Sequence, residues 1–170
     1  MQDPGGGALE FEEVYRLHVD GVYRFCLAQV RDAAAAEDLA ADVFAAAFVA
    51  YERVRPGPGG VRAWLFRIAR NAAIDRARRA HTRMRLFRLL RAEANHHDVE
   101  RDVELRSDLR STLDAISRLS ERERLLVGLR IAAGLSFAEV AAVTGMKENA
   151  ARMATSRALT KVRHEVGSHE

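Results

Sequence analysis

Residues 134–163 read GLSFAEVAAVTGMKENAARMATSRALTKVR, and this segment has the clearest structural pattern in the chain. Ser136, followed three residues later by Glu139, forms the capping-box pattern that starts a short helix. Gly145 then supplies the positive φ that a tight turn needs, and a second helix is expected from Glu148. The pattern predicts a helix-turn-helix, whose second helix fits the major groove of DNA.

The second helix of this motif has two distinct sides. Helical spacing predicts that three apolar residues are buried, namely Ala151, Leu159 and Val162. The outward residues are Asn149, Arg152, Ser156 and Arg157. An αα-hairpin without a nucleic-acid role would have the same spacing, so the motif alone does not establish DNA binding.

A second stretch, RAWLFRIARNAAIDRARR at residues 62–79, favours a nucleic-acid partner. Residues 62–91 hold ten arginines against one acid, a net charge of +9. Steps of three or four residues place Trp64, Arg67, Asn71, Asp75 and Arg78 on one stripe of a helix. Guanidinium groups beside an aromatic ring suit single-stranded nucleic acid, because they contact phosphates while the ring stacks on a base. The alternatives are a solvated basic face and a Trp64 that belongs to the core.

The preceding segment has the opposite charge. Residues 10–52 hold nine acids against three arginines, a net charge of −6. Asp38 and Asp42 stand one helical turn apart, and no Lys or Arg lies between Asp32 and Tyr51 to offset them. Such a row indicates a basic partner, since like charges at this spacing are unfavourable. Glu37 and Asp38 also suit a helix N-terminus, but Asp42 lies too deep in the helix for that explanation.

Helical periodicity runs through the whole chain, and alternating strand-like patterns are missing, so we expect an all-α protein. The first helix is expected at residues 11–31, and Asp32 is expected to cap the second. RPGPGG at residues 55–60 breaks the chain before the arginine-rich helix, which could continue towards Leu90. Residues 81–112 have mixed charges and few large apolar side chains, which suits a linker or a partly exposed helix. The remaining helices are expected at residues 113–119, 121–132, 137–143 and 148–166. Two small helical domains result.

Other features exclude several classes of protein. Cys26 is the single cysteine, so it cannot form an internal disulfide, and we expect a buried, inert thiol. His96 and His97 are adjacent, which is the wrong spacing for two metal ligands on one helix face. The chain shows no signal-peptide pattern and no apolar run of spanning length, so we expect a cytoplasmic protein without membrane insertion.

Four runs together resemble bacterial RNA polymerase sigma factors of the extracytoplasmic-function (ECF) type. They are EDLAADVF at residues 37–44, AWLFRIARNAAIDRARR at 63–79, LSERERLLVGLRIAAGLSFAEVAAVTG at 119–145 and SRALTKVR at 156–163. The resemblance implies a sigma-two helical bundle at residues 10–80, a charged linker at 81–112 and a sigma-four helix-turn-helix domain at 113–165. Residues 1–9 and 166–170 would be tails.

The resemblance also implies a function, a transcription initiation factor that is not an enzyme and needs no cofactor or metal. Such a factor binds core RNA polymerase through its clamp helices and flap, directs it to promoters and assists their melting. Its ligands are duplex promoter DNA and the melted non-template strand, so it would be nucleoid-associated when bound to polymerase. Family members are often held inactive by an anti-sigma factor, which we expect here as a hypothesis.

Site residues carry over position by position. The core-polymerase face would be Glu37, Asp38 and Asp42. The minus-ten residues would be Arg55, Arg62, Trp64, Arg67, Asn71, Arg76, Arg78 and Arg79. The minus-thirty-five residues would be Ser136, Lys147, Asn149, Arg152, Ser156, Arg157 and Lys161. The chain departs from the family at Ala41, where Gln is usual, and at Lys147, Ala151 and Ala154 of the recognition helix.

Two other hypotheses remain open from the sequence. One is a stand-alone helix-turn-helix regulator, which would bind duplex DNA without polymerase. The other is an all-α, metal-dependent nucleotide hydrolase that uses Glu37, Asp38 and Asp42. The second needs a facing acidic helix to complete a Mg²⁺ site, and no such helix is obvious in the sequence.

Overall fold

The computed structural model describes residues 10–57, 59–90 and 107–167, and every regular element in these ranges is a helix. The elements are α1 (Phe11–Val30), α2 (Ala33–Val54), α3 (Val61–Leu90), α4 (Ser107–Ser117), α5 (Glu121–Val127), the π-helix η1 (Gly128–Ala132), α6 (Phe137–Thr144) and α7 (Glu148–Gly167). We call α1 to α3 the N-terminal bundle and α4 to α7 the C-terminal bundle. The all-α expectation is confirmed.

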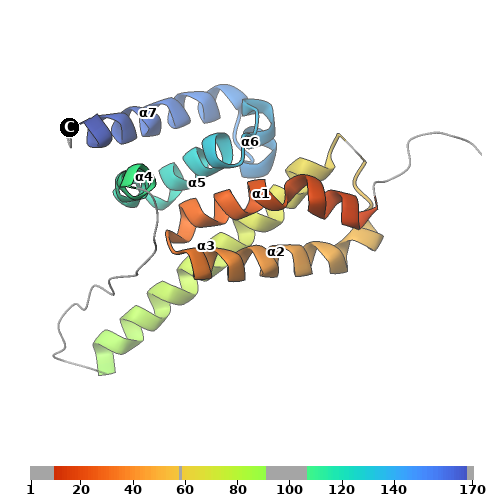
Figure 1. Ribbon diagram of the computed structural model, residues 1–170, viewed down its shortest axis with the longest axis horizontal. Helices are drawn as coiled ribbons and strands as arrows, with labels where there is room; N and C mark the ends of the chain where they lie inside the picture. Colours follow the sequence, from red (N-terminus) through yellow and green to blue (C-terminus); the bar gives the residue numbers. More distant parts are fainter. Residues whose placement is uncertain (1–9, 58, 91–106, 168–170) are drawn as a thin grey trace, which may run out of the picture.

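Local signals define the connection between α1 and α2. The carboxylate of Asp32 accepts a hydrogen bond from the Ala35 backbone N–H at 2.7 Å, which confirms the expected N-cap of α2. Arg31 closes α1 in a left-handed conformation with φ of 59°. This short connection folds α2 back along α1, and α3 crosses both helices (Figure 1). Apolar side chains of all three helices, such as Phe25, Leu39 and Leu65, are buried between them.

The C-terminal bundle contains the helix-turn-helix, formed by α6 and α7, on a support of α4 and α5. Ser120 and Glu123 form a reciprocal capping box at the start of α5. The Lys161 ammonium and the Ser120 backbone N–H both donate to Glu123, and they lower the pKa of that carboxyl to about 2. This ion pair joins α5 to α7.

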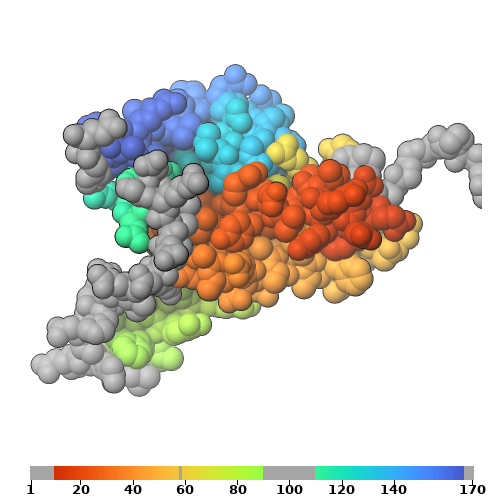
Figure 2. All heavy atoms as spheres, in the orientation of Figure 1, coloured from red at the N-terminus to blue at the C-terminus, as the bar shows by residue number. Residues whose placement is uncertain are grey.

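The two bundles share one hydrophobic core. Leu126, Leu129 and Leu135 of the C-terminal bundle belong to the same buried cluster as Phe25 and Phe66 of the N-terminal bundle. α1 lies against η1, and α3 lies against α6. The space-filling view shows the C-terminal bundle seated directly on α1 (Figure 2). We call this packing of the C-terminal bundle against α1 and α3 the closed arrangement.

Gly128 is the point where the bundles approach most tightly among the described glycines. A Cβ atom at this position would lie 2.5 Å from Gln29 Nε2 and 3.3 Å from the Phe25 ring. Gln29 Nε2 in turn donates to the Arg124 carbonyl at 3.3 Å. The absence of a side chain at Gly128 therefore allows η1 to pack against α1.

Two helices extend into the segment expected as linker, and the expectation for Cys26 is confirmed. α3 continues as one helix of 30 residues to Leu90, through the start of the segment expected as linker. α4 begins at Ser107, before the expected residue 113, so its first residues, Ser107 and Asp108, belong to the mixed-charge segment that suggested a linker. Cys26 is buried, and burial raises the pKa of its thiol to about 12, so the thiol is protonated and inert as expected.

Candidate nucleic-acid interface

The helix-turn-helix has the local structure that its sequence indicated. The Ser136 backbone N–H donates to the Glu139 carboxylate at 2.7 Å, and the Glu139 N–H donates to Ser136 Oγ at 3.2 Å. Gly145 adopts φ of 74°, in the left-handed region. Val140 and Ala151 are fully buried between the two helices. The capping box and the turn expected from the sequence are confirmed.

α7 presents most of its expected contact residues to solvent. Asn149, Arg152, Ser156 and Arg157 of α7 are exposed, as is Lys147 immediately before the helix. Arg152 donates to Glu148 at 2.9 Å, and its guanidinium lies 5.1 Å from the centre of the Phe137 ring. These contacts orient Arg152 along the N-terminal end of α7.

Two other residues expected at this interface have structural partners. The Ser136 hydroxyl is part of the α6 cap, although Ser136 itself is exposed. The Lys161 ammonium contacts Glu123 and so joins α7 to α5. A phosphate contact by Lys161 would compete with this ion pair.

On α3, the expected stripe lies mostly on the surface. Arg67, Asn71, Arg78 and Arg79 are exposed, and Arg76 is half-buried. Arg55, in the preceding loop, is exposed, has φ of 39° and forms an ion pair with Glu52. Helix α3 therefore presents several cations together, as a polyanion would require.

Trp64 has a core contact. Its ring lies 5.9 Å from that of Tyr51, with an interplanar angle of 57°, and the side chain is half-buried against the main cluster. Tyr51 itself is buried at 4% exposure. In this arrangement Trp64 packs α3 against α2.

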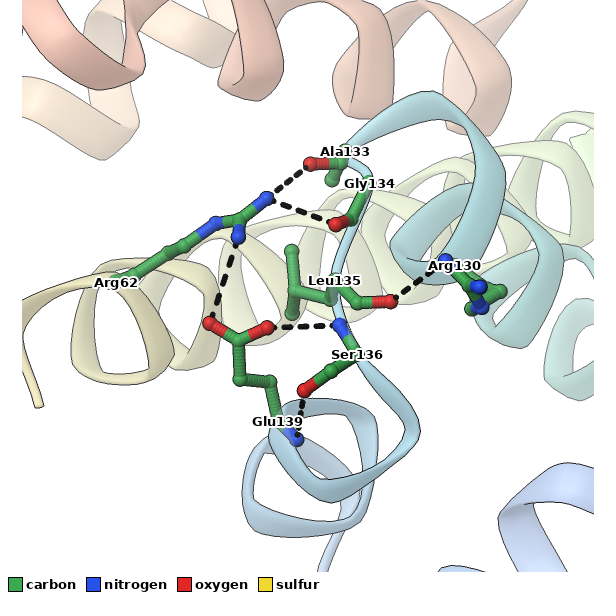
Figure 3. Close-up of polar contacts among 7 residues, drawn as sticks. All are labelled: Arg62, Arg130, Ala133, Gly134, Leu135, Ser136 and Glu139. Carbon is green, nitrogen blue, oxygen red and sulfur yellow. Dashed lines mark hydrogen bonds and ion pairs between the residues drawn. The ribbon is translucent and has the colours of Figure 1, made fainter. Parts of the chain in front are cut away.

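Arg62 joins the two bundles. Its Nη2 donates to the carbonyls of Ala133 at 2.8 Å and Gly134 at 3.0 Å, and its Nη1 lies 3.5 Å from Glu139 Oε1 (Figure 3). Glu139 also completes the α6 capping box, so Arg62 contacts the first turn of the helix-turn-helix. Two carbonyls therefore accept hydrogen bonds from a guanidinium that the family resemblance assigns to DNA, and the Glu139 carboxylate offsets its charge.

Arg67, one turn and a residue further along α3, also contacts the C-terminal bundle. Its Nη2 donates to the Ala142 carbonyl of α6 at 3.3 Å. From α1, Arg24 Nε donates to the Ala132 carbonyl at 3.0 Å. Cationic side chains of the N-terminal bundle thus bind backbone carbonyls of the C-terminal bundle at several points.

The pKa of His18 is affected by Arg62 and Glu139, which pair where the two bundles meet. Burial and the neighbouring Arg62 guanidinium lower the pKa of its imidazole, and the Glu139 carboxylate opposes the shift. Because protonation would place a second positive charge beside Arg62, the closed arrangement favours the neutral imidazole.

The acidic residues of α2 form a separate surface. Glu37, Asp38 and Asp42 are all exposed, on the side of α2 opposite its buried Leu39 and Val43. Within the described ranges, no three His, Cys, Asp or Glu side chains are grouped so that they could hold a metal ion. His96 and His97 lie outside the described residues. None of the described helices has the length and apolar character needed to cross a bilayer.

The contacts between the bundles were missed by the sequence interpretation. Arg24, Gln29 and Gly128 carried no motif that marked them as interface residues. The hydrogen-bond acceptors are backbone carbonyls 71 to 108 residues away from their donors, and a carbonyl has no side-chain signature.

A capped helix-turn-helix and a separate arginine-rich helix on one small helical chain are features of DNA-binding proteins of transcription. Residues 14–83 match the family described as Sigma-70 region 2, and residues 109–162 match Sigma-70, region 4. The chain belongs to the ECF family of RNA polymerase sigma factors. A sigma factor directs RNA polymerase to promoters for transcription initiation and is not itself an enzyme.

Individual relatives agree with this assignment. The RNA polymerase sigma factor CarQ of Myxococcus xanthus is 31% identical over 166 residues, which cover 94% of this chain and 91% of CarQ. The ECF RNA polymerase sigma factor BldN of Streptomyces coelicolor is 34% identical over 159 residues, but the match spans 59% of its length. The sigma factor RpoE of Bartonella quintana, solved in complex with the anti-sigma factor NepR, shares the fold with a TM-score of 0.70 at 21% identity, covering 92% of this chain and 96% of RpoE.

Proposed function

We propose that three surfaces of this sigma factor divide the work of promoter recognition. The acidic face of α2 (Glu37, Asp38 and Asp42) binds the basic clamp helices of core RNA polymerase. The cations of α3 take up the minus-ten element, and α7 reads the minus-thirty-five element. The observation that carries the proposal is the capped helix-turn-helix with an exposed cationic face, on the same chain as the α3 stripe.

The boundaries of the functional units follow the same division. We propose a sigma-two domain at residues 10–80 and a sigma-four domain at residues 113–165, with the segment between them as linker. The Sigma-70 region 2 match at residues 14–83 and the region 4 match at 109–162 support this division. α3, however, continues through Leu90, so the arginine-rich helix extends beyond the proposed domain.

Two DNA-binding units on one chain can together supply the free energy that promoter binding and melting require. Promoter melting without ATP requires that contacts to the opened strand recover the cost of unstacking. Each base held by stacking and cations contributes about 1 to 3 kcal/mol. Binding of one unit also raises the effective concentration of the other, so neither unit has to bind tightly alone.

Promoter binding also requires the closed arrangement to change. Arg62 and Arg67 donate to carbonyls of the C-terminal bundle, and the same guanidinium groups would contact DNA phosphates in the promoter complex. A guanidinium cannot keep both sets of partners at full strength. We infer that the two bundles separate when the factor joins polymerase and promoter.

An anti-sigma factor is a further proposed partner. RpoE was solved with the anti-sigma factor NepR, and CnrH, which shares the fold at a TM-score of 0.65, was solved with the cytosolic domain of CnrY. The likeness in fold supports a corresponding regulator for this chain. Because its proposed partners are core polymerase and promoter DNA, the chain is proposed to act in the bacterial cytoplasm.

The experiment that tests the function combines this protein with core RNA polymerase on genomic DNA and maps the transcript starts. We expect new starts that share two sequence elements at minus-ten and minus-thirty-five spacing. If no specific starts arise while the protein alone protects duplex sites, the chain acts as a stand-alone helix-turn-helix regulator instead.

The α3 stripe gives a first residue-level prediction. Replacement of Arg67 and Asn71 together by Ala should reduce open-complex formation about ten- to a hundredfold, because one base-capturing contact is lost. Binding to core polymerase should be unchanged, since α2 is untouched. Permanganate footprinting of the melted region and co-purification with polymerase measure the two effects.

A matched control is Arg88→Ala, which removes the same single positive charge from an exposed position of α3. This variant should open promoters normally. Equal loss of polymerase binding and promoter opening in the double variant would show that the stripe supports the fold and does not contact the melted strand.

A further inference from the structure

Met153 occupies the centre of the outward face of α7. The fully buried residues of this helix are Ala151, Thr155 and Ala158. At 100° per residue, the direction opposite to them is shared by Asn149, Met153, Ser156 and Thr160. All four are exposed, and Met153 is 62% exposed. An unbranched apolar side chain thus projects from the middle of the proposed DNA-reading surface.

The charged residues of α7 lie to either side of this line. Arg152 falls on one side, where Glu148 and the Phe137 ring orient it. Arg157 falls on the other side, by the same helical geometry. Arginines on two flanks are placed for the phosphates that border a groove, while the side chains between them face its floor. Base edges are therefore presented to Asn149 and Met153 more directly than to the arginines.

The chemistry of a thioether restricts what it can face in the major groove. Met has no hydrogen-bond donor and only a weak acceptor. Opposite Met153, the amino group of cytosine or the O6 of guanine would lose its water without gaining a partner, which is unfavourable. The C5-methyl of thymine is the apolar feature of the major groove, so it is the group that Met153 complements.

We propose that Met153 is a specificity-determining residue that reads a thymine methyl group in the minus-thirty-five element. This inference rests on the proposed docking of α7 in the major groove. It predicts that one thymine of the element is favoured for its methyl group and not for its hydrogen-bonding edge.

The test removes that methyl group alone. Polymerase holoenzyme formed with this protein is bound to a promoter from the transcript-start map, and each thymine of the minus-thirty-five element is replaced in turn by uracil. Wild-type holoenzyme should lose about fourfold in affinity at one position, as expected for one buried methyl group. Met153→Ala should bind the thymine and uracil promoters equally at that position.

Two further variants make the test specific. Met153→Leu keeps an apolar side chain and should retain the preference for thymine over uracil. Met84→Ala removes an exposed methionine from α3, outside the helix-turn-helix, and should behave as wild type. Because Met153 is on the surface, its replacement should leave the thermal unfolding of the chain unchanged.

Two results would overturn the proposal. Either wild-type holoenzyme tolerates uracil at every position, or Met153→Ala remains sensitive at the same thymine. In both cases promoter-specific transcription would persist, so the sigma function would stand. Failure of the proposed function would give a different result, since the holoenzyme would then bind the unmodified promoter no better than unrelated DNA.

Discussion

Replacement of Gly128 by Leu is expected to open the closed arrangement of the two bundles. Gly128 faces α1, and even a Cβ atom there would lie 2.5 Å from Gln29 Nε2. A flexible Gln side chain can move, but the Phe25 ring, 3.3 Å from the same Cβ position, is fully buried and packed against Phe66. The remaining atoms of Leu therefore have no space while η1 lies against α1.

The expected effect on the equilibrium is large. Overpacking of a well-packed site typically costs about 1 to 3 kcal/mol, which corresponds to a shift of roughly 5- to 150-fold between closed and open forms. Loss of the contact frees Arg62 and Arg67 from their carbonyl acceptors. Small-angle scattering of the free protein should show an increased radius of gyration, and the free protein should bind promoter DNA more tightly, because the apparent Kd falls as the competent fraction rises.

Gly59→Leu is the matched control for this variant. A Cβ atom at Gly59 would meet no heavy atom within 4 Å, and its φ is not positive, so the same substitution fits there. It should leave the radius of gyration unchanged. If Gly128→Leu is as compact as wild type and melts at the same temperature, the close approach at Gly128 does not hold the bundles together.

Arg24→Ala offers a milder version that leaves the packing intact. It removes one hydrogen bond to the Ala132 carbonyl, at an exposed site. Its effect should therefore be in the same direction as that of Gly128→Leu but much smaller. If the radius of gyration and the DNA affinity both increase slightly in Arg24→Ala and strongly in Gly128→Leu, the separation of the bundles accounts for the gain in affinity.

Local structure was predictable because its signals lie within a few residues of each other. The Asp32 cap and the Ser136–Glu139 capping box need one polar side chain near a helix start, and Gly145 needs only its own φ. Each of these is fixed by short-range geometry, so the sequence pattern specifies it directly.

The closed arrangement was not predictable for a related reason. Arg62 could be recognised as a cation on a helix, but its acceptors are backbone carbonyls of Ala133 and Gly134, which any residue could supply. The sequence therefore indicated a free guanidinium for DNA. Its present partners depend on how two helical bundles meet, and apolar periodicity identifies a buried face without naming its partner.

The position of a helix was also easier to predict from the sequence than its type. Residues 121–132 were expected as one helix, and the chain there is continuous, but its last turn is the π-helix Gly128–Ala132. Periodicity over so few residues does not separate the two helix types. Trp64 was open to two interpretations, and its contact with Tyr51 supports the core role.

Replacement of Asp38 and Asp42 together by Arg is expected to abolish association with core polymerase. Both residues are exposed on α2, one turn apart, and they form the proposed contact with the basic clamp helices. Two attractive contacts would become repulsive ones, and like charges placed together across an interface cost several kcal/mol. Affinity should therefore fall more than a hundredfold, and transcription from the mapped promoters should fall with it.

This experiment needs a control that separates the change in net charge of the protein from the position of the changed residues on α2. Glu12→Arg with Asp20→Arg makes the same change of net charge at two exposed sites of α1. That control should still co-purify with core polymerase, although Glu12 lies in the first turn of α1 and contributes a little to helix stability there. Circular dichroism should show equal helix content in both variants, because the four positions are on the surface.

Co-purification of the Asp38→Arg, Asp42→Arg variant at the wild-type level would remove the acidic face of α2 from the proposed interface. The polymerase contact would then have to be sought on another surface of the N-terminal bundle.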